Sequence, residues 1–424
     1  MLPLFRFFCL VLAVVLFASF DAEGQAENWP GWRGLRGDGT SLEVDVPTEW
    51  DGESGKNIRW KVAIPGSGYS SPVIHGDRIF LTSCNEGEKT RLLHCVNRES
   101  GDVLWTRAVL ESPLEGVHKL NGHASGTPAT DGELVFVTFF RTDATSGERG
   151  ESGEMLVGAF DYEGNQRWLV TVGAFSSIHG YCTSPVLYRD LVLVNGDHDG
   201  ESYLAALDKK SGEVVWKTPR VHQTRSYVTP LLRQVQGQMQ AVMAGSKCVA
   251  GFNPTTGKRL WWVEGPTEQF VASMVHDSSH FYLTAGFPTY HVMAIRHGGQ
   301  QDVTESHVSW HVNDAKSYVP SPVLAKGLLF VADDRGIAHC FDPADGEHLW
   351  RERLGPHFSA SLITAEGLVY FTADDGATTL MRAAREPIVL RVNELGERVY
   401  ASPAISHGEL FLRGTDHLFC ISEK

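Results

Sequence analysis

The strongest constraint on the fold of this chain is a repeated signature that ends in tryptophan. A small residue is followed two positions later by Asp or Asn, then by Gly, and finally by Trp. The clearest copy reads AALDKKSGEVVW and ends at Trp216. Further copies end at Trp105, Trp261 and Trp350. A repeat with a period of about 40 to 50 residues indicates that one structural unit is built many times along the chain.

Each unit contains four short apolar runs. In the first unit they read SSPVI (70–74), IFLTS (79–83), LLHCV (92–96) and VLWTRAV (103–109). They are rich in β-branched and aromatic residues, and Gly, Asn, Asp or Ser separates them, as expected for strands joined by tight turns. Repeated four-stranded antiparallel sheets predict an all-β β-propeller with one sheet in each blade.

The number of first strands gives the number of blades. These strands begin near Ser70, Gly126, Thr183, Val228, Ala272, Pro320, Ala360 and Ala401. The last repeat ends after three strands, whereas NIRWKVAI (57–64) contains Trp60 and has no strands before it. We therefore expect an eight-bladed β-propeller that is closed by an N-terminal strand pairing with the C-terminal blade. Seven blades is the alternative, if the degenerate seventh repeat is an insertion.

A tryptophan at the end of most repeats is expected to wedge one radial sheet against the next, because its large flat side chain favours burial. The seventh repeat ends in PIVLRV and has no tryptophan. The structural tryptophans that we predict are Trp60, Trp105, Trp168, Trp216, Trp261, Trp310 and Trp350.

The first residues have the composition of a secretory signal. One arginine precedes an apolar stretch from Phe7 to Phe20, and small and polar residues follow it. We interpret residues 1–24 as a signal peptide, 25–56 as an N-terminal extension and 57–424 as the propeller. An uncleaved membrane anchor is the alternative, although the apolar core is short for a spanning helix. No later stretch could span a membrane, so we expect a periplasmic or extracellular protein.

Charge and cysteine content narrow the classes of function. The chain has 51 acidic and 37 Lys or Arg residues and a formal net charge of −14, which argues against nucleic acid as a partner. Cys95, Cys340 and Cys420 occupy equivalent third-strand positions and are expected to be small buried residues. Cys84 and Cys95, on neighbouring strands, are the one pair that we consider for a disulfide. We expect a monomer.

The repeat Ala-x-Asp-x-x-x-Gly-x-x-x-Trp resembles the pyrroloquinoline-quinone (PQQ) repeat. That repeat occurs in eight-bladed quinoprotein dehydrogenases and in the propeller subunit of the outer-membrane β-barrel assembly machinery. It is also found in secreted PQQ-like proteins, whose entry segment resembles NWPGWRGLRGDGTS (28–41). The resemblance supports the fold more strongly than any chemistry, because one architecture hosts many functions.

The resemblance to quinoproteins implies a possible cofactor, PQQ with calcium. Those enzymes hold the quinone between a disulfide of adjacent cysteines and a tryptophan, with calcium bound by Glu, Asn and Asp. This sequence has no adjacent cysteine pair, and no calcium triad maps onto it. We predict no cofactor and no catalytic residue, and the motifs GxSxG and HExxH are absent.

The first strands of a propeller begin around one mouth of the central channel, and here aromatic and basic residues gather before them. They suggest a funnel for an anionic or aromatic small molecule, or for an acidic or extended peptide. The alternative is that the aromatics pack the blades and the polar groups cap loops. The candidate binding residues are Tyr69, His123, His179, Tyr181, Arg225, Tyr227, Lys316, Tyr318, His357 and Tyr400.

The acidic run Asp197–Glu201 could bind calcium through oxygen ligands, but Asp199-Gly200 is also a two-residue hairpin signal, which we favour. The histidines are scattered without ligand spacing, so we predict no metal site.

Two functions from different classes follow. The first is a non-catalytic envelope scaffold that binds a protein or peptide, with segments 111–123 and 141–154 as contact elements. The second is a PQQ-dependent oxidoreductase with atypical ligands.

Overall fold

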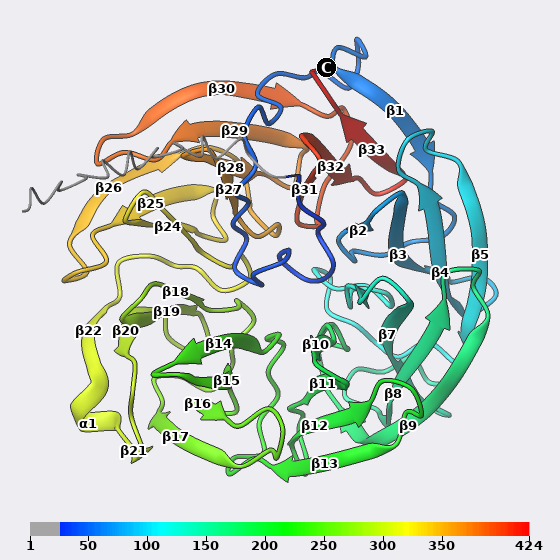
Figure 1. The fold of residues 1–424 in the computed structure, drawn as a ribbon, viewed down its shortest axis with the longest axis horizontal. Helices are drawn as coiled ribbons and strands as arrows, with labels where there is room; N and C mark the ends of the chain where they lie inside the picture. Colours follow the sequence, from blue (N-terminus) through cyan, green and yellow to red (C-terminus); the bar gives the residue numbers. More distant parts are fainter. Residues whose placement is uncertain (1–25, 424) are drawn as a thin grey trace, which may run out of the picture.

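The computed structural model describes residues 26–423, and the predicted signal peptide lies outside the described residues. In this part of the chain the strands form eight radial sheets around a central axis (Figure 1). The eight-bladed propeller is therefore confirmed, and the seventh repeat is a full blade rather than an insertion.

The first four blades run in sequence order from the innermost to the outermost strand. Blade one contains β2 (Val73–His75), β3 (Arg78–Asn85), β4 (Thr90–Asn97) and β5 (Val103–Glu111). Blade two contains β6 (Ala129–Thr130), β7 (Leu134–Arg141), β8 (Ser152–Asp161) and β9 (Gln166–Ser176). Blade three contains β10 (Val186–Tyr188), β11 (Leu191–Gly196), β12 (Tyr203–Asp208) and β13 (Val214–Pro219). Blade four contains β14 (Leu231–Val235), β15 (Gln238–Gly245), β16 (Cys248–Phe252) and β17 (Arg259–Glu264).

The next three blades follow the same order. Blade five contains β18 (Val275–His276), β19 (His280–Ala285), β20 (His291–Arg296) and β22 (Val308–Val312). Blade six contains β23 (Val323–Ala325), β24 (Leu328–Ala332), β25 (Ile337–Phe341) and β26 (His348–Arg353). Blade seven contains β27 (Ile363–Ala365), β28 (Leu368–Thr372), β29 (Ala377–Arg382) and β30 (Ile388–Glu394).

Blade eight joins the two ends of the chain. It contains β31 (Ala404–Ser406), β32 (Glu409–Arg413), β33 (His417–Ile421) and, as its outermost strand, β1 (Ile58–Ala63). β1 pairs antiparallel with β33, and Trp60 lies opposite Cys420. This pairing is the predicted closure, and it leaves no sheet edge open at the seam.

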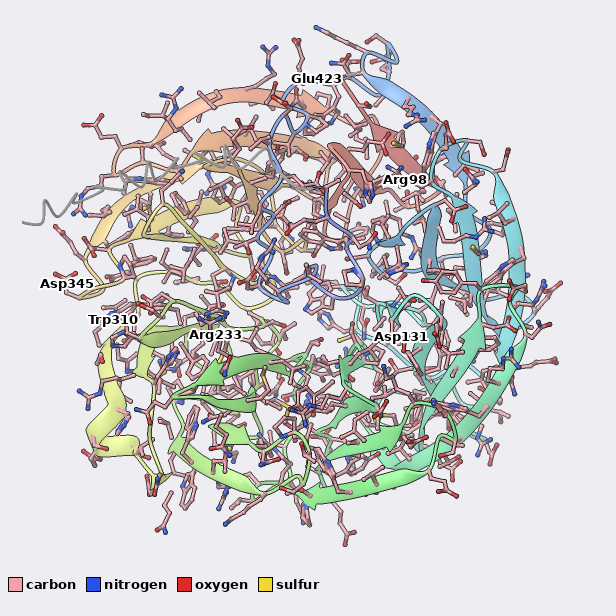
Figure 2. The ribbon with its side chains drawn as sticks, in the orientation of Figure 1. Arg98, Asp131, Arg233, Trp310, Asp345 and Glu423 are labelled. Carbon is pink, nitrogen blue, oxygen red and sulfur yellow. The ribbon has the colours of Figure 1, made fainter. Side chains whose placement is uncertain are left out.

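The terminal tryptophans join one blade to the next. The indole N–H of Trp60 donates to the carbonyl of Arg98 at 2.9 Å, in the turn between the third and fourth strands of blade one. A Cβ on Gly101 of the same turn would lie 2.8 Å from that indole ring, so only glycine lets the turn lie this close. Equivalent indole-to-carbonyl bonds link Trp105 to Tyr162, Trp168 to Lys209, Trp216 to Pro254, Trp310 to Pro343 and Trp350 to Ala384. Trp310 lies in the outer part of the ring (Figure 2).

Each tryptophan lies opposite a small residue of its own third strand. The pairs include Cys95 with Trp105, Ala206 with Trp216 and Cys340 with Trp350. A small residue there leaves room for the indole between the sheets. Cys84 and Cys95 are buried and are free thiols in the structure.

Trp261 departs from the pattern, and the cause is an insertion in blade five. Its indole N–H donates to Gln240 of its own blade, and its ring stacks on Phe281 of blade five with the ring centroids 5.9 Å apart. The turn that should receive it is replaced by β21 (Gln301–Asp302) and α1 (Thr304–His307). β21 pairs parallel with β17, so the sheet of blade four has five strands where four were predicted.

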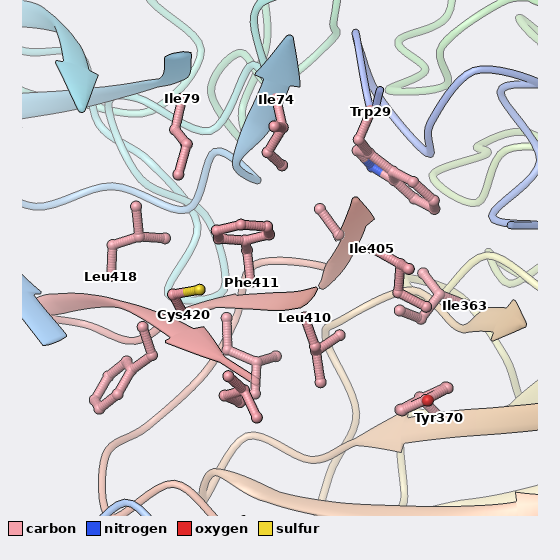
Figure 3. Close-up of a cluster of buried hydrophobic side chains, with 14 of the residues drawn as sticks. Trp29, Ile74, Ile79, Ile363, Tyr370, Ile405, Leu410, Phe411, Leu418 and Cys420 are labelled. Carbon is pink, nitrogen blue, oxygen red and sulfur yellow. The ribbon is translucent and has the colours of Figure 1, made fainter. Parts of the chain in front are cut away.

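Blade seven has an arginine at the position where the other blades have tryptophan. Its Arg391 lies opposite Leu380 on the third strand. In blade six, Trp350 lies opposite Cys340 at the same place. The segment before β1 supplies an indole to this junction. Trp50 is 2 % exposed and belongs to the hydrophobic cluster that blades seven, eight and one share. Figure 3 shows part of this cluster, including Tyr370 of blade seven and Phe411 of blade eight.

The contact between turn and indole gives a direct prediction. Gly346→Ala is expected to destabilise the protein more than Gly327→Ala, although both glycines have positive φ values, 78° and 74°. Both variants acquire left-handed backbone strain of about 1–2 kcal/mol. The new Cβ at residue 346 would also lie 2.6 Å from Trp310, whereas at residue 327 it meets nothing within 4 Å. The collision should add about 1–3 kcal/mol. Urea denaturation of both variants measures the difference, and equal losses would contradict the proposed blade joint.

Candidate functional site

The inner strands begin around a cavity of about 210 Å³ at one mouth of the central channel. We call this cavity the cup. Its rim is formed by side chains that precede the first strands, and its walls contain a layer of serine and threonine hydroxyls. Of the ten residues predicted for the mouth, those that line the cup are Tyr69, His179, Tyr227, Tyr318 and Tyr400.

Hydroxyls of the inner blade ends join the blades, and two of these hydroxyls, those of Ser184 and Ser402, also line the cup. The backbone N–H of Ser402 donates to Ser71 Oγ at 3.0 Å, and that of Ser71 donates to Thr127 Oγ1 at 2.9 Å. In the same way, a backbone N–H donates to a hydroxyl of the next blade in four further pairs, given with the donor first: Thr127 to Ser184, Ser273 to Ser321, Ser321 to Ser361 and Ser361 to Ser402. The wall is therefore fixed by the closure of the ring.

The floor of the cup is Trp32, from the segment that precedes the propeller. This side chain lines both the cup and a second cavity beyond it, and its indole N–H donates to Ser273 Oγ at 3.0 Å. The segment 28–41, dark blue in Figure 1, runs across the centre of the ring. Its backbone exchanges hydrogen bonds with Ile74 of blade one and Thr364 of blade seven. The cup is therefore closed at its inner end.

A lip over the mouth comes from the segment 112–123 between blades one and two, which makes up all but the first residue of the predicted contact element 111–123. His118, Leu120 and Asn121 of this lip line the cup, and Asn121 Nδ2 donates to the carbonyl of His179 at 2.8 Å. Arg91 anchors the lip from below: it is fully buried, pairs with Glu115 at 2.6 Å and also donates to the carbonyl of Ser112. The lip also meets the other predicted contact loop, 141–154, through Gly116 and Arg149.

The lining of the cup carries no formal charge. Among the described residues, no Asp, Glu, Lys or Arg lines it. Burial, together with the nearby positive charge of Arg225, lowers the pKa of His179 to about 4, so this imidazole is neutral at pH 7. Burial raises the pKa of Tyr318 well above its ordinary value and that of the Cys182 thiol to about 12, so both remain protonated.

The other predicted mouth residues lie outside the cup. Tyr181 is 5 % exposed, because its side chain points away from the channel into the hydrophobic core between blades two and three. There it packs against Phe175. Arg225 forms an ion pair with Asp199 at 2.5 Å, and this carboxylate neutralises the positive charge that was expected at the mouth.

Three further predicted residues also sit beside the cup rather than in it. His357 Nδ1 pairs with Asp374 at 2.8 Å, and Asp374 accepts the N–H of Ser359 in the cup wall. His123 is the last residue of the lip, and its Nδ1 lies 3.5 Å from the carboxylate of Glu115. Lys316 is exposed, with its ammonium 6.0 Å from the centroid of the Tyr290 ring. The two histidines thus lie against carboxylates, and the expected cationic funnel is not formed by the residues that line the cup.

The acidic run after β11 has a structural role that sequence analysis did not foresee. Asp197 is fully buried, accepts from Arg220 at 3.0 Å and accepts from Ser226 at 2.7 Å. The connection from β11 to β12 spans six residues, so Asp199 and Gly200 do not form the predicted two-residue hairpin. Within residues 26–423, no group of three His, Cys, Asp or Glu side chains is placed to hold a metal ion.

PQQ with calcium does not fit the cup. Calcium needs several oxygen ligands, which are usually carboxylates, and PQQ itself carries carboxylates that need cationic partners. The described lining offers hydroxyls, two imidazoles, one amide, one thiol and one indole N–H, with neither carboxylates nor cations.

The neutral state of His179 gives a prediction. Its imidazole is expected to titrate near pH 4, because the charged form loses hydration in the cup and lies near Arg225. The folded pKa lies below the ordinary value of 6.5, so the contribution of this group to stability is present above pH 6.5 and declines as the pH falls toward 4. Imidazole NMR, assigned with the variant His179→Gln, measures this pKa. Titration near 6.5 would show that this imidazole is solvated rather than buried in the lining of the cup.

Comparisons with known proteins support the propeller fold. The sequence profile of the family described as "Outer membrane protein assembly factor BamB" matches residues 43–139, 88–352, 306–386 and 334–422. BamB from Francisella salina is 30% identical over 101 residues, which are 22% of this chain and 18% of that protein. The polyvinylalcohol dehydrogenase of Pseudomonas sp is 23% identical over 70% of this chain and 47% of its own length.

A second polyvinylalcohol dehydrogenase, from Sphingopyxis sp., is 22% identical over 83% of this chain and 54% of its own length. The chain thus spans about half the length of these dehydrogenases.

Solved structures share the fold at low identity. BamB from Moraxella catarrhalis superposes with a TM-score of 0.59 and 13% identity, over 87% of this chain and 97% of that one. A europium-containing methanol dehydrogenase gives a TM-score of 0.60 and 11% identity, over 93% and 91% of the two chains. Since the family profile covers most of the described residues, the chain belongs to the BamB-like family of PQQ-repeat propellers.

Proposed function

We propose that this chain is a non-catalytic, monomeric scaffold of the cell envelope, secreted or periplasmic, that binds a segment of a partner protein in the cup. The observation that carries the proposal is the uncharged lining of a channel mouth that Trp32 closes from inside. Within the described part of the chain, no helix has the length and apolar character that a membrane crossing requires.

The shape and chemistry of the cup favour a particular kind of segment. Because the floor is closed, a chain cannot thread through the ring, and the ligand must be a loop tip or chain end that presents one side chain. Tyr69 and Tyr400 pack together at the rim with centroids 4.7 Å apart, and the wall supplies hydroxyls. An uncharged aromatic side chain gains stacking and edge contacts here, whereas a carboxylate would lose hydration without a cationic partner.

The oxidoreductase alternative rests on the resemblance of the repeat to quinoproteins and on the dehydrogenases found by comparison. The donor set of the cup argues against it. The matched part of this chain spans only about half the length of the two polyvinylalcohol dehydrogenases, so their activity belongs to proteins with additional sequence.

A peptide titration tests the proposal. Blocked, uncharged hexapeptides with a central Trp or Phe are expected to bind more tightly than the same peptides flanked by Glu. Tyr69→Ala and Tyr400→Ala should each weaken binding by about tenfold, since an aromatic contact contributes about 0.5–1.5 kcal/mol beyond its buried area. Tyr188→Ala, on β10 and away from the cup, is the matched control and should leave binding unchanged. Isothermal titration calorimetry gives the affinities.

Two results would overturn the proposal. The first is preferential binding of the Glu-flanked peptides, or affinities that the tyrosine variants do not change. The second is that the protein takes up PQQ with calcium stoichiometrically, as measured by absorbance, and catalyses dye-linked alcohol oxidation. This activity would have to be lost in Val271→Trp, whose larger side chain fills the cup.

A further inference from the structure

A second cavity lies on the other side of Trp32, between the segment 28–41 and the inner strands of blades two to five. Its volume is about 410 Å³, within the range of small-molecule sites. Its walls include Pro30, Leu187, Leu232 and Met239, which are apolar, and Arg233, which is not. This combination suits a ligand with an apolar body and one polar group.

Arg233 has no protein partner among residues 26–423. Its Nε is buried and makes no hydrogen bond, and its guanidinium forms neither an ion pair nor a ring contact there. In Figure 2 it lies closer to the centre of the ring than Trp310 does. A half-buried guanidinium without a partner is unfavourable, because the loss of hydration is not offset by an anion or a carbonyl.

The other charges around this cavity already have partners. Arg36 forms a two-pronged ion pair with Glu27, at 2.8 and 2.6 Å. Asp38 accepts from the N–H and hydroxyl of Thr40 and lies 3.7 Å from His276. His276 directs Nδ1 to the carbonyl of Asp277 at 3.2 Å, and burial lowers its pKa, so it is neutral at pH 7. One guanidinium is thus left to be neutralised by one negative charge.

We propose that this cavity binds a small monocarboxylate with a short apolar chain, whose carboxylate pairs with Arg233 and whose chain packs against Leu232 and Met239. The planar guanidinium fork matches the two oxygens of a carboxylate. A phosphate dianion would leave one negative charge uncompensated in a poorly hydrated cavity. The inference is independent of the function proposed for the cup, because it concerns different residues on the opposite side of Trp32.

Calorimetry and thermal unfolding with hexanoate test the proposal on the whole protein. Hexanoate is expected to bind and to raise the melting temperature, because a ligand that binds only the folded state stabilises it. Arg233→Gln should weaken hexanoate binding by about tenfold or more, since hydrogen bonds to charged groups are the strong ones. Arg351→Gln, which removes an exposed arginine from β26, is the matched control and should bind like the wild type. 1-Hexanol should bind at least about tenfold more weakly than hexanoate.

The unliganded variant supplies a second readout. Arg233→Gln removes an unpaired charge, so its melting temperature without ligand should equal or exceed that of the wild type. If this variant did not fold, Met239→Trp, which fills the cavity and keeps the arginine, should also abolish hexanoate binding. The proposal is overturned if hexanoate does not bind, if Arg233→Gln binds it as tightly as the wild type, or if inorganic phosphate binds more tightly than hexanoate.

Discussion

The contact between the terminal indole of one blade and the turn of the next is the interaction on which the rest of the structure depends. A four-stranded sheet has two faces to bury, and each blade does so only against its neighbours. The indole fixes that contact in two ways: its face covers a glycine in the turn, and its N–H donates to a turn carbonyl. Repeated around the ring, the joint sets the spacing between blades, and the pairing of β1 with β33 closes the ring.

Closure determines what the channel can do. The inner strands are joined by hydroxyls that accept backbone N–H groups of the preceding blade, so the wall of the cup is rigid and its polar groups are partly satisfied. Trp32 then divides the channel into two cavities of different chemistry. The outer one is aromatic and uncharged, and the inner one contains an unpaired guanidinium. A single segment before the first blade thereby gives one channel two separate candidate sites.

The repeat was sufficient to predict the architecture, because strand length, turn residues and the tryptophan period all lie within each unit. The exceptions come from contacts between distant parts of the chain. Trp261 bonds within its own blade because the insertion of blade five removes its turn. Trp50 reaches the junction of blades seven and eight from outside the repeat, and neither its role nor that of Trp32 could be inferred from periodicity. The Ser-Pro and Thr-Pro pairs at residues 71, 127, 184, 229, 321 and 402 were a repeated signal that could have revealed the hydroxyl layer.

The site was predicted less well than the fold for a related reason. A residue that precedes a first strand can point into the channel, as Tyr227 does, or into the core between blades, as Tyr181 does, and its position in the sequence does not distinguish these. More positive charge was expected at the mouth than the structure shows, because Arg225 and His357 pair with the carboxylates of Asp199 and Asp374. These carboxylates come from other loops, so the pairing cannot be inferred from neighbouring positions in the sequence.

Hydrogen–deuterium exchange of residues 28–41 tests the central claim most directly, namely that this segment is part of the ring and closes the cup. The amides of Trp29 and Ser41, which donate to the carbonyls of Ile74 and Thr364, are predicted to exchange as slowly as those of the inner strands β2 and β27. Exchange at the rate of an unstructured chain, with the inner strands still protected, would show that the channel is open at both ends and that the cup has no floor.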